Sequence, residues 1–285
     1  MHLLSSFFEL FILNPFLLMA LLAGLAASIT SGIIGSYVVT KRIVFITGSI
    51  SHAVLGGMGL FLWLKRTYNL SFLSPMQGAI LSALAAAALL GWTHLKYKER
   101  EDSIIAAIWA TGMSIGVIFI TLTPGYNVEL MNFLFGNILW VTQADMTAIF
   151  ILDGLVLGCT LLFYRKFQAI CFDEEQAALQ GVSVKPLYIL LLCLVALSVV
   201  VLIQVVGAIL VIAMLTMPAA AAASLSRRLS SMMKLAIFFS MLLTCIGIYA
   251  SYQLNWPPGA TITLISAGFY GAVLYSSKLR LKYLS

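Results

Sequence analysis

Charged residues are scarce in this sequence. Only 9% of the 285 residues are charged and 62% are hydrophobic. In a soluble domain about a quarter of the residues are charged and about half are hydrophobic. The 16 basic and 10 acidic residues stand in short clusters between long apolar runs. This composition excludes a soluble globule. The net charge of +6 predicts no nucleic-acid binding, because the cations form no single patch, and we interpret it as a sign of membrane topology.

The sequence also lacks the signatures of nucleotide binding and of hydrolysis. It contains no GxxxxGK[ST] loop and no Gly-Lys dipeptide, so it cannot hold ATP phosphates in that manner. HExxH, GxSxG and paired intramembrane aspartates are absent too. The four cysteines have no CxxC spacing and are interpreted as small packing residues. We therefore expect no enzyme here, and ATP hydrolysis only in a separate partner chain.

Long runs without charge are what the sequence does contain. A helix needs about 20 residues to cross the hydrocarbon core. Two runs exceed 40 residues and should each cross twice, with turns near Gln204–Gly207 and at Asn255–Gly259. Five further crossings are predicted at 10–40, 43–64, 67–95, 103–128 and 147–164. The predicted fold is an all-α polytopic helical bundle of nine spans, forming a single transmembrane domain over 1–285. Eight spans with one re-entrant piece is the alternative.

The placement of cations supports nine spans. With this count, fourteen Lys and Arg residues lie on one side and only Lys65 and Arg66 on the other. Because cytoplasmic loops carry excess Lys and Arg, the N-terminus is predicted outside and the C-terminus in the cytoplasm. Lys278, Arg280 and Lys282 would then contact lipid headgroups. The apolar stretch 130–143 is too short to cross and is predicted to be an interfacial helix on the outer side.

The informative ionisable residues are those well inside predicted spans. His52 lies near the middle of the second span, and helical spacing places Gly48, Gly56 and Gly59 on its face, which predicts room beside the imidazole. It could line an ion pathway, or it could be a packing histidine beside glycines that allow close helix contact. Asp153 in the fifth span is the other candidate, and it could equally be a hydrogen-bonded helix contact. The pairs Gly112/Gly116 and Gly154/Gly158 also permit close packing, or they could equally be ordinary glycines of membrane helices.

A set of motifs resembles the membrane subunits of ABC importers for zinc, manganese and iron. The second-span motif runs from Lys41-Arg42-Ile43-Val44-Phe45 to Ser51-His52-Ala53-Val54-Leu55 and Gly57. Further matches follow in order at Glu101-Asp102-Ser103, 128–139, Asp173-Glu174 with Ala177 and Gly181, 206–211, 217–222 and Pro258-Gly259-Ala260. Each piece is weak, but the combination in this order is specific and covers the chain from about Leu18 to Tyr275.

The resemblance implies an ATP-driven importer of divalent Zn, Mn or Fe, the transported ion being the substrate. It further implies a homodimer of this permease, two cytoplasmic ATPase subunits, an extracytoplasmic metal-binding protein, and a place in the bacterial inner membrane. By this analogy His52 contacts the passing ion. The family usually has an acidic residue four positions earlier, where this chain has Gly48.

The segment 218–231 is predicted to be a short cytoplasmic helix that couples to the ATPase. Pro218 can begin a helix, and the alanines that follow have high helix propensity. The family places its coupling segment here, so the candidates are Pro218, Ala219, Ala222, Ser226, Arg227 and Arg228. Alternatively, the segment is the inner end of the seventh span with arginines that reach the interface. Asp173, Glu174 and Glu175 are predicted to begin a surface helix.

An ion- or proton-coupled secondary transporter that uses His52 and Asp153 directly is the alternative function. Such a transporter should show inverted repeats and paired intramembrane charges, and the sequence has neither.

Overall fold

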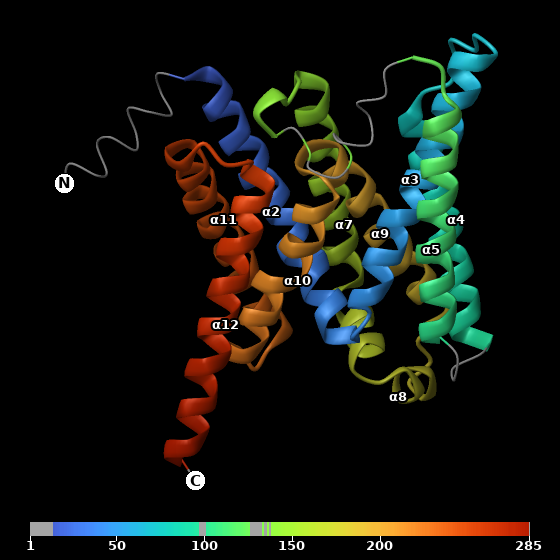
Figure 1. The fold of residues 1–285 in the computed structure, drawn as a ribbon. Coiled ribbons are helices and arrows are strands. Elements are labelled where there is room, and N and C mark those ends of the chain that lie inside the picture. The colour runs from blue at the N-terminus through green and yellow to red at the C-terminus, as the bar shows by residue number, and fades with distance from the viewer. Residues whose placement is uncertain (1–13, 97–100, 126–132, 134–135, 137, 285) are drawn as a thin grey trace. The chain divides into compact units, whose positions relative to one another are not determined.

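The computed structural model describes residues 14–96, 101–125, 133, 136 and 138–284. Within these residues the secondary structure is helical, with no strand. Figure 1 follows the helices in chain order. They are α2 (Pro15–Lys41), α3 (Val44–Thr67), α4 (Pro75–Lys96), α5 (Glu101–Leu122), η2 (Ile138–Trp140), α7 (Gln143–Phe172), α8 (Glu174–Leu179), α9 (Val184–Val206), α10 (Ala208–Leu225), α11 (Leu229–Leu254) and α12 (Pro258–Leu284).

Nine of the described helices are long and apolar enough to cross a membrane: α2, α3, α4, α5, α7, α9, α10, α11 and α12. The all-α fold class and the count of nine are therefore confirmed. The structure extends the fifth span, since α7 continues past Arg165 and Lys166 to Phe172. The predicted interfacial helix over 130–143 lies largely outside the described residues, and its described part contains the single 3₁₀ turn of η2.

Both turns predicted inside the long apolar runs are confirmed. Gly207 separates α9 from α10 with φ of 83°, a left-handed conformation that glycine adopts without strain. Asn255 ends α11 with φ of 54°, and α12 begins at Pro258. Proline is favoured at the start of a helix because the amide it lacks would have no partner there.

The helix boundary expected at Pro218 is wrong. Pro218 lies inside α10, which continues to Leu225, and no separate helix runs over 218–231. The chain instead breaks at 226–228, where Ser226 and Arg228 have extended backbones. The small residues after Pro218 maintain the helix, because Ala219 and Ala222 are completely buried and tertiary packing outweighs the one hydrogen bond that proline removes.

The described residues belong to two compact units. The first comprises Met1–Val39, Phe135–Gly158 and Val201–Ser285, and the second comprises Thr40–Leu134 and Cys159–Val200. In the first unit α10, α11 and α12 pack on one another. In the second unit α3 packs on α4 and, more extensively, on α5, and Figure 1 shows these three helices side by side.

Candidate functional site

His52 lies on α3 and stacks on a tryptophan of α5. Its imidazole and the indole of Trp109 have ring centroids 4.8 Å apart and planes inclined by 23°. The side chain is half-buried, and its Nδ1 atom is buried without a hydrogen-bond partner in the described structure. An imidazole nitrogen can carry a proton or donate an electron pair to a metal. The position therefore offers an unused polar atom within a membrane span.

The glycines on the His52 face of α3 bring α5 close instead of leaving open space. A Cβ atom at Gly56 would lie 2.9 Å from the carbonyl oxygen of Gly112, and one at Gly59 would lie 2.8 Å from that of Gly116. The expected room beside the imidazole is thus taken up by α5 within this chain. Sequence spacing identified the face correctly, but it could not show which helix packs against it.

The two glycine pairs behave differently. A Cβ atom at Gly112 would lie 2.7 Å from the Cα atom of Ala53, which confirms the close packing expected of Gly112/Gly116. At Gly154 and Gly158 no described atom lies within 4 Å of such a Cβ atom. Small residues four positions apart therefore mark a helix contact in one case and not in the other.

Asp153 lies on α7 and is 5% exposed. One carboxylate oxygen, Oδ1, accepts a hydrogen bond of 2.5 Å from the hydroxyl of Thr30 on α2. The other, Oδ2, is buried without a partner in the described structure. The hydrogen bond provides the helix contact that was one of the two sequence-based interpretations of Asp153.

His52 and Asp153 belong to different units, His52 to the second and Asp153 to the first. The part of the chain that the structure describes has no group of three or more His, Cys, Asp or Glu side chains able to hold a metal ion.

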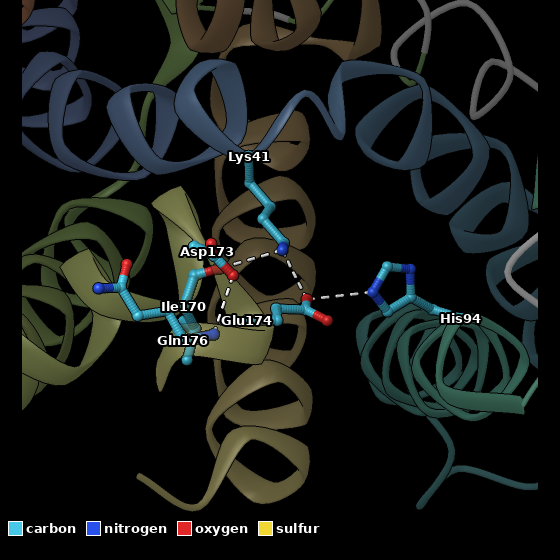
Figure 2. A network of polar contacts seen from close by, with 6 residues as sticks. All are labelled: Lys41, His94, Ile170, Asp173, Glu174 and Gln176. Carbon is cyan, nitrogen blue, oxygen red and sulfur yellow. Dashed lines mark hydrogen bonds and ion pairs between the residues drawn. The ribbon is translucent and has the colours of Figure 1, made fainter. Parts of the chain in front are cut away.

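A charged network at the ends of four helices was not predicted from the sequence. Figure 2 shows Glu174 of α8 between Lys41, the last residue of α2, and His94 near the end of α4. Oxygen Oε1 of Glu174 lies 2.5 Å from Lys41 Nζ and 3.1 Å from His94 Nε2. Lys41 also donates a 3.0 Å hydrogen bond to the carbonyl of Ile170, near the end of α7. The network ties α8 to α2, α4 and α7.

Electrostatics favour the ionised form of Glu174. Its hydrogen bond with His94 is the largest cause that lowers the pKa of this carboxyl, to about 2, and the nearby Lys41 contributes while burial opposes both. The side chains of Lys41 and Glu174 are only 13% and 16% exposed. His94 further stacks on Tyr188, with ring centroids 4.3 Å apart. The carboxylate therefore stays charged at neutral pH as a structural anchor.

The local sequence explains how α8 presents Glu174. Asp173 caps the helix, since its side chain accepts a 3.0 Å hydrogen bond from the backbone amide of Gln176. This confirms the surface helix expected to begin at the acidic run. The acidic run was the available signal, but nothing in the spacing connects Glu174 with Lys41, 133 positions earlier in the chain, or with His94, 80 positions earlier.

The candidate coupling residues divide into buried and exposed groups. Pro218, Ala219 and Ala222 are buried in the first unit, and a Cβ atom on Gly35 of α2 would lie 3.3 Å from that of Ala219. Ser226 is half-buried and donates a hydrogen bond to the carbonyl of Ala222, whereas Arg227 and Arg228 are exposed. Only the arginines and their immediate neighbours can meet a partner directly.

The fold and these residues define a multi-pass helical membrane protein with isolated polar atoms inside its spans. The chain belongs to the ABC 3 transport family, whose model matches residues 14–277. This confirms the resemblance drawn from the ordered motifs, and identifies the chain as a membrane permease of that family.

Relatives of known description cover almost the whole chain. A protein of Chlamydia pneumoniae described as a probable metal transport system membrane protein is 48% identical over 97% of this chain and 92% of its own length. A manganese transport system membrane protein of Listeria monocytogenes is 33% identical over 92% of this chain and 91% of its own. Among solved structures, PsaBC from Streptococcus pneumoniae, in complex with Fab, matches with a TM-score of 0.82 and 28% identity over 95% of both chains.

Proposed function

We propose that this permease forms the translocation pathway of an ATP-driven importer of divalent transition-metal ions. Family membership and relatives described as metal or manganese transport proteins support a metal substrate. The resemblance to ABC importers implies two cytoplasmic ATPase subunits, which would supply the phosphate-binding loop that this sequence lacks, and the proposal includes them. It also includes a second copy of the permease and an extracytoplasmic metal-binding protein. Zn, Mn and Fe are the candidate ions.

The observation that carries a pathway role is the buried, unpartnered Nδ1 of His52. A polar atom left without a hydrogen bond inside a membrane is costly, so its presence in a span favours a function. A neutral imidazole suits first-row divalent metals. One protein ligand binds weakly, which allows a conducted ion to leave again. We propose that His52 is a transit ligand.

The test replaces His52 with phenylalanine, which keeps an aromatic ring for stacking on Trp109 but has no nitrogen donor. Uptake of each divalent ion by the reconstituted transporter should fall at least about tenfold, with assembly unchanged. Gly158→Ala is the matched control, because no described atom lies within 4 Å of the added methyl group. Parental uptake by an assembled His52→Phe variant would exclude the transit role.

Asp153 is a second proposed pathway residue, supported by its buried and unpartnered Oδ2. Asp153→Asn keeps a carbonyl oxygen that can accept the hydrogen bond from Thr30 but removes the negative charge. Reduced uptake with unchanged thermal stability would support an ionic role. Unchanged uptake would leave Asp153 as a helix contact.

The loop between α10 and α11 is the proposed ATPase-coupling segment. Arg227 and Arg228 would contact the ATPase directly. The end of α10 would support the loop through Pro218, Ala219, Ala222 and Ser226. Exchange of both arginines for Glu should impair ATP-dependent transport, because acids would replace cations on the contact. Lys234→Glu is the control, since Lys234 is also exposed but lies outside the segment. Normal coupling in the arginine variant would contradict the assignment.

We also propose that 1–285 acts as one permease domain in the bacterial inner membrane, with its C-terminus in the cytoplasm. Contributions of α2, α7 and α9 to both units support one domain. The distribution of cations, fourteen against two, supports the orientation. Cysteines placed at Ser103 and Ser277 should be labelled only from inside, and one at Ser71 only from outside. The reverse pattern would contradict the topology.

A further inference from the structure

A cavity of about 440 Å³ lies at one end of the first unit, where α2 begins and α11 ends (Figure 1). The start of α2, the single turn of η2 and the end of α11 line it. This volume is within the range of small-molecule sites, about 300–1,000 Å³. Its described lining residues include no charged side chain, histidine or cysteine. A divalent ion would therefore find there none of the charged or imidazole ligands that such ions prefer.

Aromatic side chains form the walls of the cavity. The rings of Phe16 on α2 and Trp140 on η2 have centroids 5.6 Å apart. Trp256, in the turn after α11, lines another side, and all three rings are more than half exposed. Leu17 and Ile248, by contrast, are buried and form the floor, with only 3% and 1% of their surface exposed. The cavity thus presents ring faces and aliphatic groups to its occupant.

The floor lies at the depth of the membrane hydrocarbon. With 26 residues, α11 is about 39 Å long and extends beyond a hydrocarbon core of about 30 Å. Ile248 is six residues, or about 9 Å, before the last residue of α11. Trp256 and the turn at Asn255 therefore lie at the level of the headgroups, where tryptophan is enriched, and Ile248 lies at the level of the acyl chains.

Polar side chains line the mouth of the cavity. Asn14 precedes α2, and its Oδ1 accepts a 3.2 Å hydrogen bond from the backbone amide of Phe16. The hydroxyl of Ser251 donates a 2.6 Å hydrogen bond to the carbonyl of Trp256, and Asn255 stands in the left-handed turn between them. A site that is polar at its mouth and apolar at depth suits an amphiphilic ligand.

The cavity continues onto an exposed apolar side of α11. Tyr252 forms part of its wall, and Leu242 and Phe238 lie 10 and 14 residues earlier. Helical spacing places these three side chains within about 80° of one another, and they are 40–57% exposed. An acyl chain lying along this side in the bilayer can enter the cavity without crossing the headgroups. A soluble partner would meet only the mouth, because the floor lies at hydrocarbon depth.

We propose that this cavity binds one acyl chain of a membrane glycerophospholipid, whose glycerol region lies at the polar mouth. Burial of the chain against aromatic and aliphatic side chains provides the binding energy. Because the described residues at the mouth carry no charge, binding should not depend on the charge of the headgroup. The bound lipid would join α2, η2 and α11 at this end of the first unit.

The first test measures how readily a lipid reaches Trp140. The full chain is purified in lipid-free detergent, and phosphatidylethanolamine brominated on one acyl chain is added at increasing mole fraction. Emission from Trp140 is the difference between the parental chain and Trp140→Phe, which keeps an aromatic ring beside Phe16. It should be half-quenched at about tenfold lower lipid fraction than emission from Trp92 of α4. Trp92 is the control because it is 52% exposed and lies outside the cavity, and equal fractions overturn the proposal.

The second test places a charge in the cavity. Leu139 of η2 is half-buried and lines the cavity. Leu139→Glu should raise the lipid fraction that half-quenches Trp140 by at least about tenfold, because the acyl chain would have to desolvate a carboxylate. Leu254→Glu is the matched control, since Leu254 is exposed at the same end of α11 but does not line the cavity. Equal effects overturn the proposal. Should Leu139→Glu fail to fold, the comparison of Trp140 with Trp92 decides.

A change of headgroup separates recognition of the acyl chain from recognition of charge. Brominated phosphatidylglycerol should quench Trp140 at the same lipid fraction as phosphatidylethanolamine, within about twofold. A preference of about tenfold for the anionic lipid would overturn the proposal. Occupation of the cavity by a second copy, or by other residues of this chain, would leave Trp140 quenched no earlier than Trp92, which also overturns it. These experiments measure no metal uptake, so their failure leaves the importer proposal standing.

Discussion

Two histidines of the second unit sit in similar aromatic surroundings and differ in their polar partners. His52 stacks on Trp109 at 4.8 Å, and His94 stacks on Tyr188 at 4.3 Å. His94 Nε2 meets Oε1 of Glu174, whereas His52 Nδ1 is buried without a partner in the described structure. The two imidazoles therefore share the same kind of stacking and differ in whether a hydrogen-bond partner is present.

The comparison also extends to what surrounds each ring. His52 lies on a glycine-rich helix face that allows α5 to approach, while His94 belongs to a network of charges at helix ends. The first arrangement is stabilised by close backbone packing and the second by ion pairing. Substitutions near His52 should therefore act mainly on helix packing, and substitutions near His94 mainly on ion pairing.

The largest expected effect comes from closing the α3–α5 contact with a bulky side chain. Gly112→Leu should destabilise the protein by about 2–3 kcal/mol or prevent folding, because its Cβ atom would already lie 2.7 Å from Ala53 Cα. Gly158→Leu, where no described atom lies within 4 Å, is the control. Thermal unfolding of both purified proteins checks this, and equal midpoints would show that the contact is not close in solution.

Removal of the charge at Glu174 should have the next largest effect. Glu174→Gln should lower the free energy of unfolding by about 2 kcal/mol, because Lys41 and His94 lose their shared anionic acceptor in a largely buried position. Lys185→Gln removes one charge from an exposed position nearby in sequence and serves as the control. Matching thermal midpoints for the two variants would show that the network contributes little.

Parallel substitution of the two histidines tests the comparison directly. His94→Phe should cost about 1 kcal/mol, because it keeps a stacking ring but loses the bond to Glu174. His52→Phe should be neutral or slightly stabilising, because it removes a buried atom that has no partner. Thermal midpoints measured side by side decide, and a larger loss at His52 would reverse the assignment of structural and functional histidine.

Acidification should remove the contribution of the Glu174 carboxylate gradually, with little change near neutral pH. The pKa of Glu174 is lowered from 4.5 to about 2 in the folded protein, so its contribution to stability is present above pH 4.5 and is lost as the pH falls toward 2. The difference in thermal midpoint between parental protein and Glu174→Gln should persist above about pH 5 and shrink as the pH falls from there toward 2. A difference that shrinks already near pH 6 would contradict the lowered pKa.

Much of the fold was predictable because membrane burial imposes simple local rules. The need for about 20 apolar residues per crossing identified nine spans, and glycine and proline chemistry located the turns at Gly207 and Pro257-Pro258. The predicted helix start at Pro218 was wrong because helix propensity and proline position describe only the local sequence. They do not include the burial of Ala219 and Ala222, which continues α10 through the proline.

The sequence by itself determined that this is an all-α membrane protein of the ABC 3 transport family, that ATP chemistry is not built into its motifs, and that His52 is an ionisable group inside a span. These features follow from composition, run length and ordered motifs. Only the tertiary structure decided that Trp109 stacks on His52, that Thr30 binds Asp153, and that Glu174 joins Lys41 to His94. The physical reason is that each of these contacts joins different helices, and periodicity along a single helix gives the direction of a side chain without the identity of what it meets.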